Sequence, residues 1–276
     1  MISVLILTLN EEANIQRCLD AVAWSDDVVV LDDGSTDATA EVARRTGARV
    51  IRHSAGDELA QRTYAIREIP FKHAWVYNPD ADEVPSPELV EEMQRAVADS
   101  SRQEMAYRVR FKTMFMGRWI RHASLYPTWV VRLFRPEALS FERTTNLRYV
   151  VAGPEGRLSG HFVHYSFDKG LESWFAKHNR YSTHEAEENL RALRSGTTPW
   201  RGLLSPEAVE RRRSLKELSV RMPFRPTLRF LYMYVLRLGF LDGSAGLTYC
   251  RLLSTYERMI VWKMREIRRR EQGLPI

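Results

Sequence analysis

Acidic and amide side chains follow three of the apolar segments in the first 100 residues of this 276-residue chain. Carboxylates that converge on one point repel one another unless a cation lies among them, and hard oxygen ligands at this density suit Mg²⁺ or Mn²⁺. The side chains concerned are Thr8, Asn10 and Glu11; then Asp32, Asp33, Ser35, Thr36 and Asp37; and finally Asn78, Asp80, Asp82 and Glu83. A metal held by only one or two carboxylates keeps open positions that substrate phosphates can fill, so the sequence predicts a divalent-metal site for a phosphate-bearing substrate.

A sheet is needed to bring these side chains together, and the hydrophobic pattern predicts one. Short apolar runs alternate with segments of helical periodicity, which indicates a parallel sheet with crossover helices. The expected strands are residues 2–7, 27–31, 48–51 and 74–77, and the expected helices are residues 11–22, 36–46, 58–69 and 86–98. In an open parallel sheet, ligands bind at the carboxyl ends of the strands. We therefore expect an α/β fold in which the three polar groups share one edge.

Two carboxylates of the last group, Asp80 and Asp82, are separated by a single residue directly after a predicted strand. If strand geometry persists, alternation sends both side chains to the same side. The alternative is that the two residues only form a turn and cap the helix that opens at Ser86. The matching acidic turn after the second strand favours the metal interpretation.

The pattern changes beyond Arg102. Strands are expected at residues 105–113 and 129–134, with an aromatic and basic loop between them, and after His164 the chain is helical nearly to its end. The sequence therefore predicts an α/β domain over residues 1–168 and a helical region over residues 169–276.

These motifs, in this order and each after a strand, resemble those of family two glycosyltransferases with the GT-A fold. The motifs are Thr8-Leu9-Asn10-Glu11, Asp32-Asp33-Gly34-Ser35-Thr36-Asp37 and Asp80-Ala81-Asp82-Glu83. The second half is similar to a narrower group, the bacterial lipopolysaccharide-core glycosyltransferases that add a hexose to an inner-core sugar, at residues 132–135, 164–166, 177–182 and 230–237. The resemblance implies that the first domain binds a nucleotide sugar and is catalytic, and that the helical region contacts the acceptor, a membrane or another subunit.

The resemblance also implies how the nucleotide is bound. Thr8, Asn10 and Glu11 would line the nucleotide pocket of a UDP-sugar donor. Asp32 or Asp33 would accept a hydrogen bond from the uracil ring. Both expectations place the nucleotide across the ends of the first two strands.

A divalent ion on the diphosphate is the next implication. Asp82 would reach this Mg²⁺ or Mn²⁺, with Asp80 close by. Such an ion acts as a Lewis acid that stabilises the leaving diphosphate.

Basic side chains near the presumed end of the sheet are further candidates. Residues 56–62 resemble the family's stretch ahead of the donor-contacting arginine. Arg62 is therefore a candidate to bind the diphosphate or the sugar, or else a solvated charge on a helix. His164 belongs to the His-Tyr-Ser match and could approach the metal, whereas a lone histidine such as His161 is more often structural. Arg132 and Arg135 bracket a strand end, where they could hold an acceptor phosphate or lie in solvent.

The general base is where the sequence departs from the group that it resembles. Deprotonation of an acceptor hydroxyl normally needs a carboxylate. The best alignment puts Leu147 where this carboxylate stands in the core transferases. Three alternatives follow: Glu142 or Glu155, the nearest carboxylates in sequence, takes the role; the substrate or a phosphate assists; or catalysis is weak or absent. We favour Glu142 or Glu155 without choosing between them.

The C-terminal region is basic and rich in apolar residues. Residues 201–276 carry 16 Lys and Arg against 7 Asp and Glu, a local charge of +9, which leaves 25 against 28, or −3, for residues 1–200. Residues 228–241 are almost entirely apolar but shorter than the roughly 20 residues of a membrane span, and a turn at residues 242–246 should separate them from a long helix over residues 247–269. The pattern is typical of a helix in the interface of an anionic membrane, although packing on the sheet or against a second subunit is the alternative. Nucleic acid is not favoured, because the basic residues are interleaved with a continuous apolar surface and no recognised binding module is present.

Composition narrows the class of protein. An apolar fraction of 44% and a charged fraction of 28% exclude a disordered, collagenous or integral-membrane chain. Cys18 and Cys250 match no metal or redox spacing, which favours a reducing, cytoplasmic compartment. The amino terminus lacks the features of a signal peptide and is expected to be a buried strand.

Together these observations predict an inverting hexosyltransferase at the inner face of the cytoplasmic membrane. Its donor would be a UDP-sugar and its acceptor a lipid-linked glycan, the lipopolysaccharide inner core. The alternatives are an enzyme of the same fold that acts on polyprenyl phosphate, and a non-catalytic scaffold that binds a nucleotide sugar. A homo-oligomer is compatible with the sequence.

Overall fold

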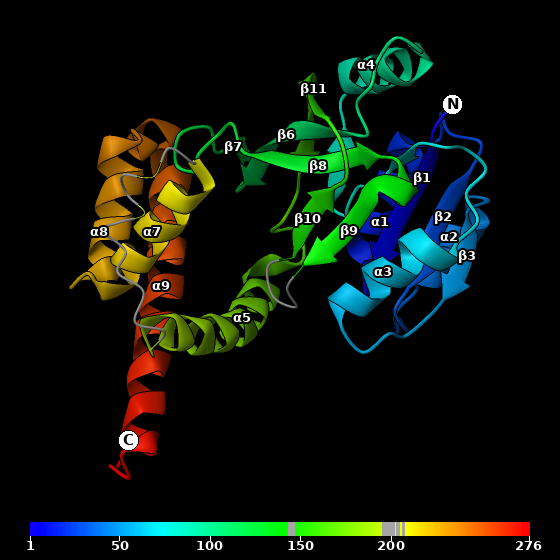
Figure 1. Cartoon of the computed structure of the whole chain (residues 1–276). Helices are drawn as coiled ribbons and strands as arrows, with labels where there is room; N and C mark the ends of the chain where they lie inside the picture. Colours follow the sequence, from blue (N-terminus) through cyan, green and yellow to red (C-terminus); the bar gives the residue numbers. More distant parts are fainter. Residues whose placement is uncertain (143–146, 195–201, 203–204, 206–207) are drawn as a thin grey trace. The chain divides into compact units, whose positions relative to one another are not determined.

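The computed structural model describes residues 1–142, 147–194, 202, 205 and 208–276 (Figure 1). The chain forms two compact units. The first comprises Met1–Trp119 with Tyr126–Lys169, and the second comprises Ile120–Leu125 with Gly170–Ile276. The first unit is α/β and the second is helical, so the predicted fold class is confirmed.

The first unit is built on a mixed sheet of nine strands, in the order β3-β2-β1-β4-β8-β6-β11-β5 with β7 beside β6. Strands β1, β2, β3 and β4 are parallel, as predicted, and β8 is antiparallel to both β4 and β6. The strands are β1 (Ser3–Thr8), β2 (Val28–Asp32), β3 (Arg49–Arg52), β4 (Val76–Tyr77), β5 (Glu83–Pro85), β6 (Ala106–Phe115), β7 (Arg118–Trp119), β8 (Trp129–Phe134) and β11 (Glu155–His164).

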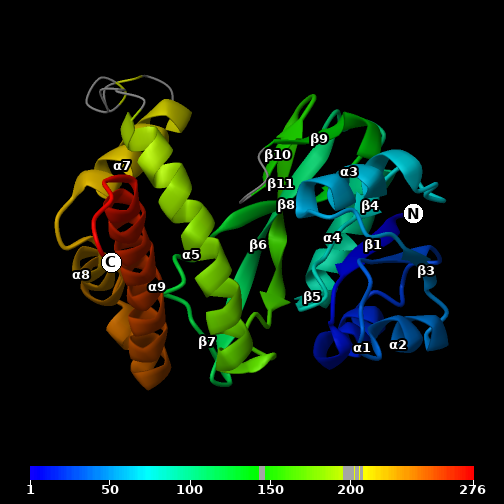
Figure 2. The same cartoon turned by 90° about the horizontal axis from the view of Figure 1, so that it is seen from below.

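Helices cover both faces of the parallel part. Figure 2 shows α3 on one side of β1, β2 and β3, with α1 and α2 on the other side. Ser86 caps α4 through its hydroxyl oxygen, which accepts from the Leu89 N–H at 3.2 Å, and Asp57 caps α3 by accepting from the Ala60 N–H at 2.7 Å. The helices are α1 (Glu12–Ala21), α2 (Thr39–Arg45), α3 (Glu58–Glu68) and α4 (Pro87–Ala98).

Two apolar clusters hold these layers together. One includes Ile6, Ile15 and Met93 and joins the sheet to α1 and α4. The other, on the α3 side, includes Leu5 and Ile66 and is extended by a small antiparallel ribbon, β9 (Leu139–Glu142) paired with β10 (Arg148–Val151), which follows the short 3-10 turn Pro136–Ala138. Burial of side chains on both faces explains why β1 and β2 are continuous apolar runs.

Strands β5, β7, β9, β10 and β11 were not predicted from the sequence. The β11 segment contains Gly156 and Gly160, which weaken the strand pattern but permit close packing. A Cβ atom on Gly160 would lie 2.7 Å from the Cα of Leu89 in α4. Glycine is therefore required where α4 crosses β11.

The second unit contains α5 (Gly170–Arg194), α7 (Ala208–Arg221), α8 (Arg225–Leu231) and α9 (Gly243–Glu271). Helices α5 and α9 pack through Ala186, Leu190, Ile260 and Met264. The turn predicted at residues 242–246 is wrong in extent, because Gly243 already begins α9; Gly246 lies inside this helix, where a Cβ would approach the Gly239 carbonyl oxygen to 2.3 Å. In the described part of the chain, no helix is long and apolar enough to cross a membrane.

Candidate functional site

The three polar groups lie at the carboxyl ends of adjacent strands. Thr8, the last residue of β1, pairs with Asp32 at the end of β2. Asp80, which follows β4, forms an isolated parallel bridge with Leu7 of β1. The sheet therefore brings residues about 70 positions apart in sequence to one edge, as the hydrophobic pattern predicted.

The loops after β1 and β2 are tied to each other by their own polar side chains. The Oδ1 atom of Asn10 accepts from the Thr36 N–H at 2.9 Å, and the Asn10 N–H donates to the Ser35 Oγ atom at 2.9 Å. Asn10 has a φ of 54°, a left-handed conformation that asparagine tolerates better than most residues. The Glu11 N–H donates to the Thr39 Oγ1 atom at 2.8 Å. Asn10 and Glu11 thus position the two loops.

Asp32 and Asp33 differ in what their carboxylates do. The Asp32 carboxylate is fully buried, accepts from the Ser35 N–H at 3.2 Å and from the Thr8 Oγ1 atom at 3.3 Å, and lies 3.5 Å from the Arg52 Nε atom. Asp33 is only half-buried, and its backbone N–H donates to the Thr8 carbonyl oxygen at 2.9 Å. Asp32 therefore shapes the loop, and Asp33 presents the more accessible carboxylate.

Asp80 is held between two buried arginines. Its Oδ2 atom lies 2.6 Å from the Arg132 Nη2 atom and its Oδ1 atom lies 3.3 Å from the Arg62 Nη2 atom. Burial alone would raise the pKa of Asp80, but Arg132 and Arg62 hold it well below its usual range. Asp80 is therefore an ionised carboxylate whose charge is already balanced by protein groups.

Arg62 comes from α3 and makes four polar contacts. Its guanidinium donates to Asn78 Oδ1 at 3.1 Å, to the Tyr149 hydroxyl at 2.7 Å and to Glu58 Oε1 at 2.9 Å, in addition to the Asp80 contact. Only 8% of Arg62 is exposed, so it is not the solvated surface charge that the sequence left open. Tyr149 lies in β10, and nothing in the sequence pattern had indicated that it reaches this edge.

Arg132 occupies a place that the sequence did not predict. It lies within β8, is buried, and donates from Nη2 to Glu83 Oε1 at 2.5 Å as well as to Asp80. Glu83 is 1% exposed, and burial raises its pKa to about 7, against the opposing pull of Arg132. Arg132 is therefore neither solvated nor free for an acceptor phosphate; it neutralises the two inner carboxylates.

Asp82 and His164 form the outer part of the edge. The Oδ2 atom of Asp82 lies 3.3 Å from the Nε2 atom of His164, and their side chains are 24% and 25% exposed. Burial alone would lower the pKa of His164, but the Asp82 carboxylate raises it above its ordinary value. His164 ends β11 and pairs with Glu83 of β5, which fixes the imidazole beside the acidic turn.

The donor set at this edge fits a divalent cation with two protein ligands. A carboxylate oxygen and an imidazole nitrogen are both ligands of Mn²⁺-type ions, and two such ligands leave positions for phosphate oxygens and water. Asp80 is excluded from this set by its arginine partners. Among the described residues, no group of three or more His, Cys, Asp or Glu side chains is arranged to hold a metal, so any ion here depends on its substrate for the remaining ligands.

The structure places Glu155 far from Asp82 and pairs Glu142 with Arg148. Glu155 begins β11, opposite Ala106, whereas His164 ends the same ten-residue strand, which separates them by roughly 30 Å of extended chain. Glu142 is 3.6 Å from Arg148 on the exposed face of the β9–β10 ribbon, opposite to the face on which Tyr149 packs. Residues 143–146, next to the expected base position Leu147, lie outside the described residues.

Comparison with protein families identifies the first unit. Residues 3–156 match the model of the family described as glycosyl transferase family 2. An uncharacterised glycosyltransferase of Rickettsia typhi is 32% identical over 199 residues, which are 68% of this chain and 67% of the relative. A lipopolysaccharide core biosynthesis glycosyltransferase, LpsC of Rhizobium meliloti, is 22% identical over 275 residues, 93% of this chain and 92% of the relative.

Two solved structures are also similar. One is glucosyl-3-phosphoglycerate synthase of Mycobacterium tuberculosis, in complex with Mn²⁺, UDP-glucose and phosphoglyceric acid. It is 25% identical with a TM-score of 0.35, and the match covers 41% of this chain and 44% of the synthase chain. Staphylococcus aureus TarS 1–349 is 16% identical with a TM-score of 0.44 and covers 99% of this chain and 91% of its own.

Proposed function

We propose that this chain, which belongs to glycosyltransferase family 2, transfers a hexose with inversion from a UDP-sugar to a lipid-linked glycan. The observation that carries the proposal is the Asp82–His164 pair, 3.3 Å apart beside a neutralised Asp80, at the sheet edge where the carboxyl ends of β1, β2 and β4 meet. Nucleotides bind at this edge in open parallel sheets.

The nucleotide end of the donor is assigned to the loops after β1 and β2. Asp33 accepts a hydrogen bond from the uracil ring, because Asp32 already uses its carboxylate to hold Ser35 and Thr8. Thr8, Asn10 and Glu11 line the pocket through loops that their own hydrogen bonds fix in place. Such preorganisation lowers the ordering cost of binding.

The diphosphate end is assigned to the outer pair. Asp82 and His164 would hold a divalent ion, Mg²⁺ or Mn²⁺, whose chemistry is that of a Lewis acid on the leaving diphosphate. Arg62 and Arg132 contribute indirectly, since they keep Asp80 ionised and fix the turn that carries Asp82. The Asp80 N–H donates to Glu83 Oε2 at 3.1 Å, which locks the same turn from the other side.

The acceptor is proposed from the full-length similarity to LpsC. This relative is named for lipopolysaccharide core biosynthesis and aligns with 93% of this chain, including the helical region. A lipid-linked inner-core glycan is the corresponding acceptor, which puts the enzyme at the inner face of the cytoplasmic membrane. Residues 169–276 would then serve acceptor, membrane or subunit contacts.

A second candidate is a scaffold that binds a nucleotide sugar without transferring it. The observation that favours it is that Glu155 begins β11, far from Asp82, while Glu142 is paired with Arg148. A donor hydrolysis assay separates the two functions, since a scaffold releases no UDP.

The test is UDP release from a panel of UDP-hexoses with Mn²⁺, with and without a lipopolysaccharide-core acceptor. We expect one donor to be turned over, Asp82→Asn to abolish turnover, and Asp20→Asn, which alters an exposed carboxylate of α1, to leave it unchanged. Turnover that survives Asp82→Asn, or that never rises above background with any donor, would refute the proposed enzyme.

A further inference from the structure

The second unit exposes an unusual run of apolar side chains between residues 228 and 241. Soluble monomers rarely expose contiguous apolar patches larger than a few hundred Å². The exposed members are Leu228, Leu231, Tyr232, Val235, Leu236, Leu238, Phe240 and Leu241, with Leu236 74% and Leu241 55% exposed. They lie on α8, on the wide turn Tyr232–Leu236 and on the 3-10 turn Gly239–Asp242, except Leu238, which directly precedes the 3-10 turn. We call these eight residues the apolar patch.

Charge in and beside the apolar patch is positive. Residues 223–241 contain Arg225, Arg229 and Arg237 and no acidic residue. The first acidic residue after them, Asp242, is buried and accepts from the His122 N–H at 2.9 Å and from the Ala123 N–H at 2.8 Å. Because the Asp242 carboxylate is buried and hydrogen-bonded, no exposed negative charge of this segment repels an anionic surface.

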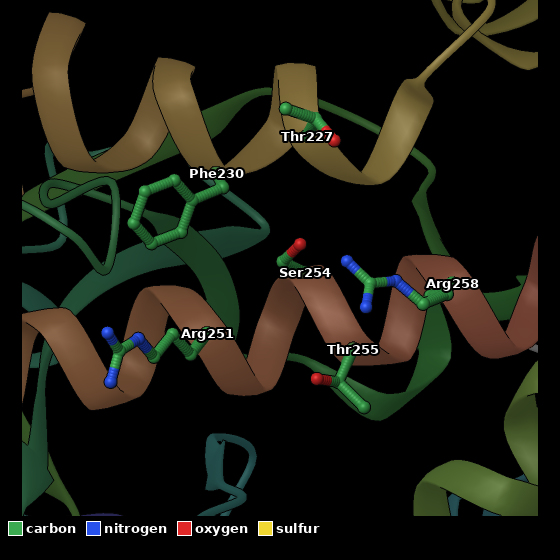
Figure 3. Close-up of a pocket in the computed structure, with 6 residues that line it drawn as sticks. All are labelled: Thr227, Phe230, Arg251, Ser254, Thr255 and Arg258. Carbon is green, nitrogen blue, oxygen red and sulfur yellow. The ribbon is translucent and has the colours of Figure 1, made fainter.

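A cavity of about 350 Å³ opens between α8 and α9, next to the apolar patch. Figure 3 shows Thr227 and Phe230 projecting from α8 toward α9, with the guanidinium of Arg258 beside Ser254 and Arg251 nearer to Phe230. The lining residues are Thr227, Phe230, Arg251, Ser254, Thr255 and Arg258. The volume lies within the roughly 300–1,000 Å³ range of ligand pockets. The lining therefore offers two cations, three hydroxyls, one ring and no carboxylate.

The two arginines of the cavity are available to a ligand. Arg251 and Arg258 are both exposed, and neither forms an ion pair with a described residue. By contrast, the neighbouring Arg225 is paired with Glu257 at 2.8 Å. The cavity itself is fixed, because the Ser254 hydroxyl donates to the Pro226 carbonyl oxygen at 2.8 Å and so joins α9 to the start of α8. Guanidinium groups beside hydroxyls are the donors that phosphate oxygens prefer.

We infer that this cavity binds the phosphate of an anionic phospholipid in a bilayer, while the apolar patch enters the lipid interface beside it. The cavity and the apolar patch share a helix. Thr227 and Phe230 line the cavity on α8, and Leu228 and Leu231 of the same short helix belong to the apolar patch. A phospholipid offers a phosphate and acyl chains in one molecule, whereas a soluble phosphate uses the cavity alone. Apolar side chains interleaved with arginines are typical of interfacial binding.

This inference deepens the proposed function and rests on it, because the proposed lipid-linked acceptor lies in the membrane that the second unit would bind. It can fail separately. If the protein binds vesicles but turns over no UDP-sugar, the proposed transferase function is refuted and the proposed lipid site is not. Turnover without vesicle binding would do the reverse.

The experiment is flotation of the full-length protein with vesicles of phosphatidylcholine alone or with 30 mol% phosphatidylglycerol. We expect binding to the anionic vesicles only. Arg251→Gln/Arg258→Gln should weaken it roughly 25-fold, since each of the two basic residues at an anionic surface contributes about a fivefold factor. The matched control is Arg265→Gln/Arg268→Gln, which removes the same charge from exposed positions of α9 outside the cavity, and should change binding less than threefold. Equal losses of vesicle binding in the two double variants would indicate diffuse electrostatic attraction and would overturn the proposed role of the cavity.

Two further arms distinguish the other occupants. Leu236→Ser/Phe240→Ser should also abolish vesicle binding. If instead the unaltered protein binds no vesicles but self-associates with rising concentration, and this variant does not, the apolar patch binds a second copy of the chain. Thermal stabilisation by inorganic phosphate that depends on Arg251 and Arg258, without vesicle binding, would assign the cavity to a soluble anion. Salt-sensitive binding to a DNA duplex instead of vesicles would equally contradict the inference. Acceptor-free UDP-sugar hydrolysis should be unchanged in Arg251→Gln/Arg258→Gln.

Discussion

Replacement of Arg132 by methionine should destabilise the first unit more than any exposed charge replacement. The Arg132 side chain is 9% exposed and contacts Glu83, whose side chain is 2% exposed, at 2.5 Å. Removing one partner of a buried ion pair costs about 3–5 kcal/mol, because Glu83, whose pKa burial already raises to about 7, must then either stay charged without compensation or take up a proton. The contact with Asp80 adds less, since the Asp80 side chain is 37% exposed and keeps Arg62.

This loss is measurable as a shift of the unfolding midpoint. At roughly 2–4 °C per kcal/mol for a domain of 150–250 residues, Arg132→Met should lower Tm by about 6–20 °C. Urea unfolding followed by tryptophan fluorescence and by circular dichroism gives the free energy directly. The control is Arg148→Met, which removes an exposed arginine 3.6 Å from Glu142 and should cost less than about 1 kcal/mol.

A double variant separates the charge from the packing of the arginine stem. Arg132→Met/Glu83→Gln removes both partners, so it should recover at least half of the stability that the single variant loses. The reasoning is refuted if Arg132→Met costs less than about 1 kcal/mol, or if the double variant is no more stable than the single one.

Three other predictions follow from the geometry. Glu142→Gln and Glu155→Gln should each keep UDP-sugar turnover within about twofold, since Glu155 begins β11 far from Asp82 and Glu142 is paired with Arg148; a hundredfold loss in either would restore that residue as the general base. Gly160→Ala should destabilise by about 1–3 kcal/mol in urea unfolding, because the new methyl group meets the Leu89 backbone at 2.7 Å; an unchanged midpoint would contradict this packing. Burial alone would raise the pKa of Glu92, but hydrogen bonds from the Ser159 and Gly160 N–H groups lower it, so its contribution to stability is present above the unfolded-state pKa and is lost as pH falls through the folded-state pKa. Glu92→Gln should therefore make the free energy of unfolding depend less on pH in the acid range, and a pH profile identical to that of the unaltered protein would refute the assignment.

The parallel half of the sheet was predictable because its physics is local. Continuous apolar, β-branched runs such as residues 28–31 favour strands buried on both faces, and each is followed by a segment of helical periodicity. The order of elements then places Thr8, Asp32 and Asp80 on one edge without further information. The Asp82–His164 contact was suggested only by the family resemblance of His164.

The inner half of the site was not predictable, because it depends on long-range pairing. Arg132 reaches Asp80 because β8 lies between β4 and β6 and is antiparallel to both. The sequence pattern of such a strand does not indicate which strands it pairs with. Tyr149 reaches Arg62 through a four-residue strand that is too short to recognise. The separation of Glu155 from the site follows from the parallel pairing of β11 with β6, which sequence proximity to Leu147 concealed.

The most direct test of the central claim is calorimetric titration of UDP into the protein, with and without Mn²⁺. The account predicts Mn²⁺-dependent binding that Asp82→Asn and His164→Ala each weaken by roughly tenfold or more, while Asp20→Asn binds as the unaltered protein does. Binding of UDP that is independent of Mn²⁺, or that is the same in Asp82→Asn and His164→Ala as in the unaltered protein, would contradict it.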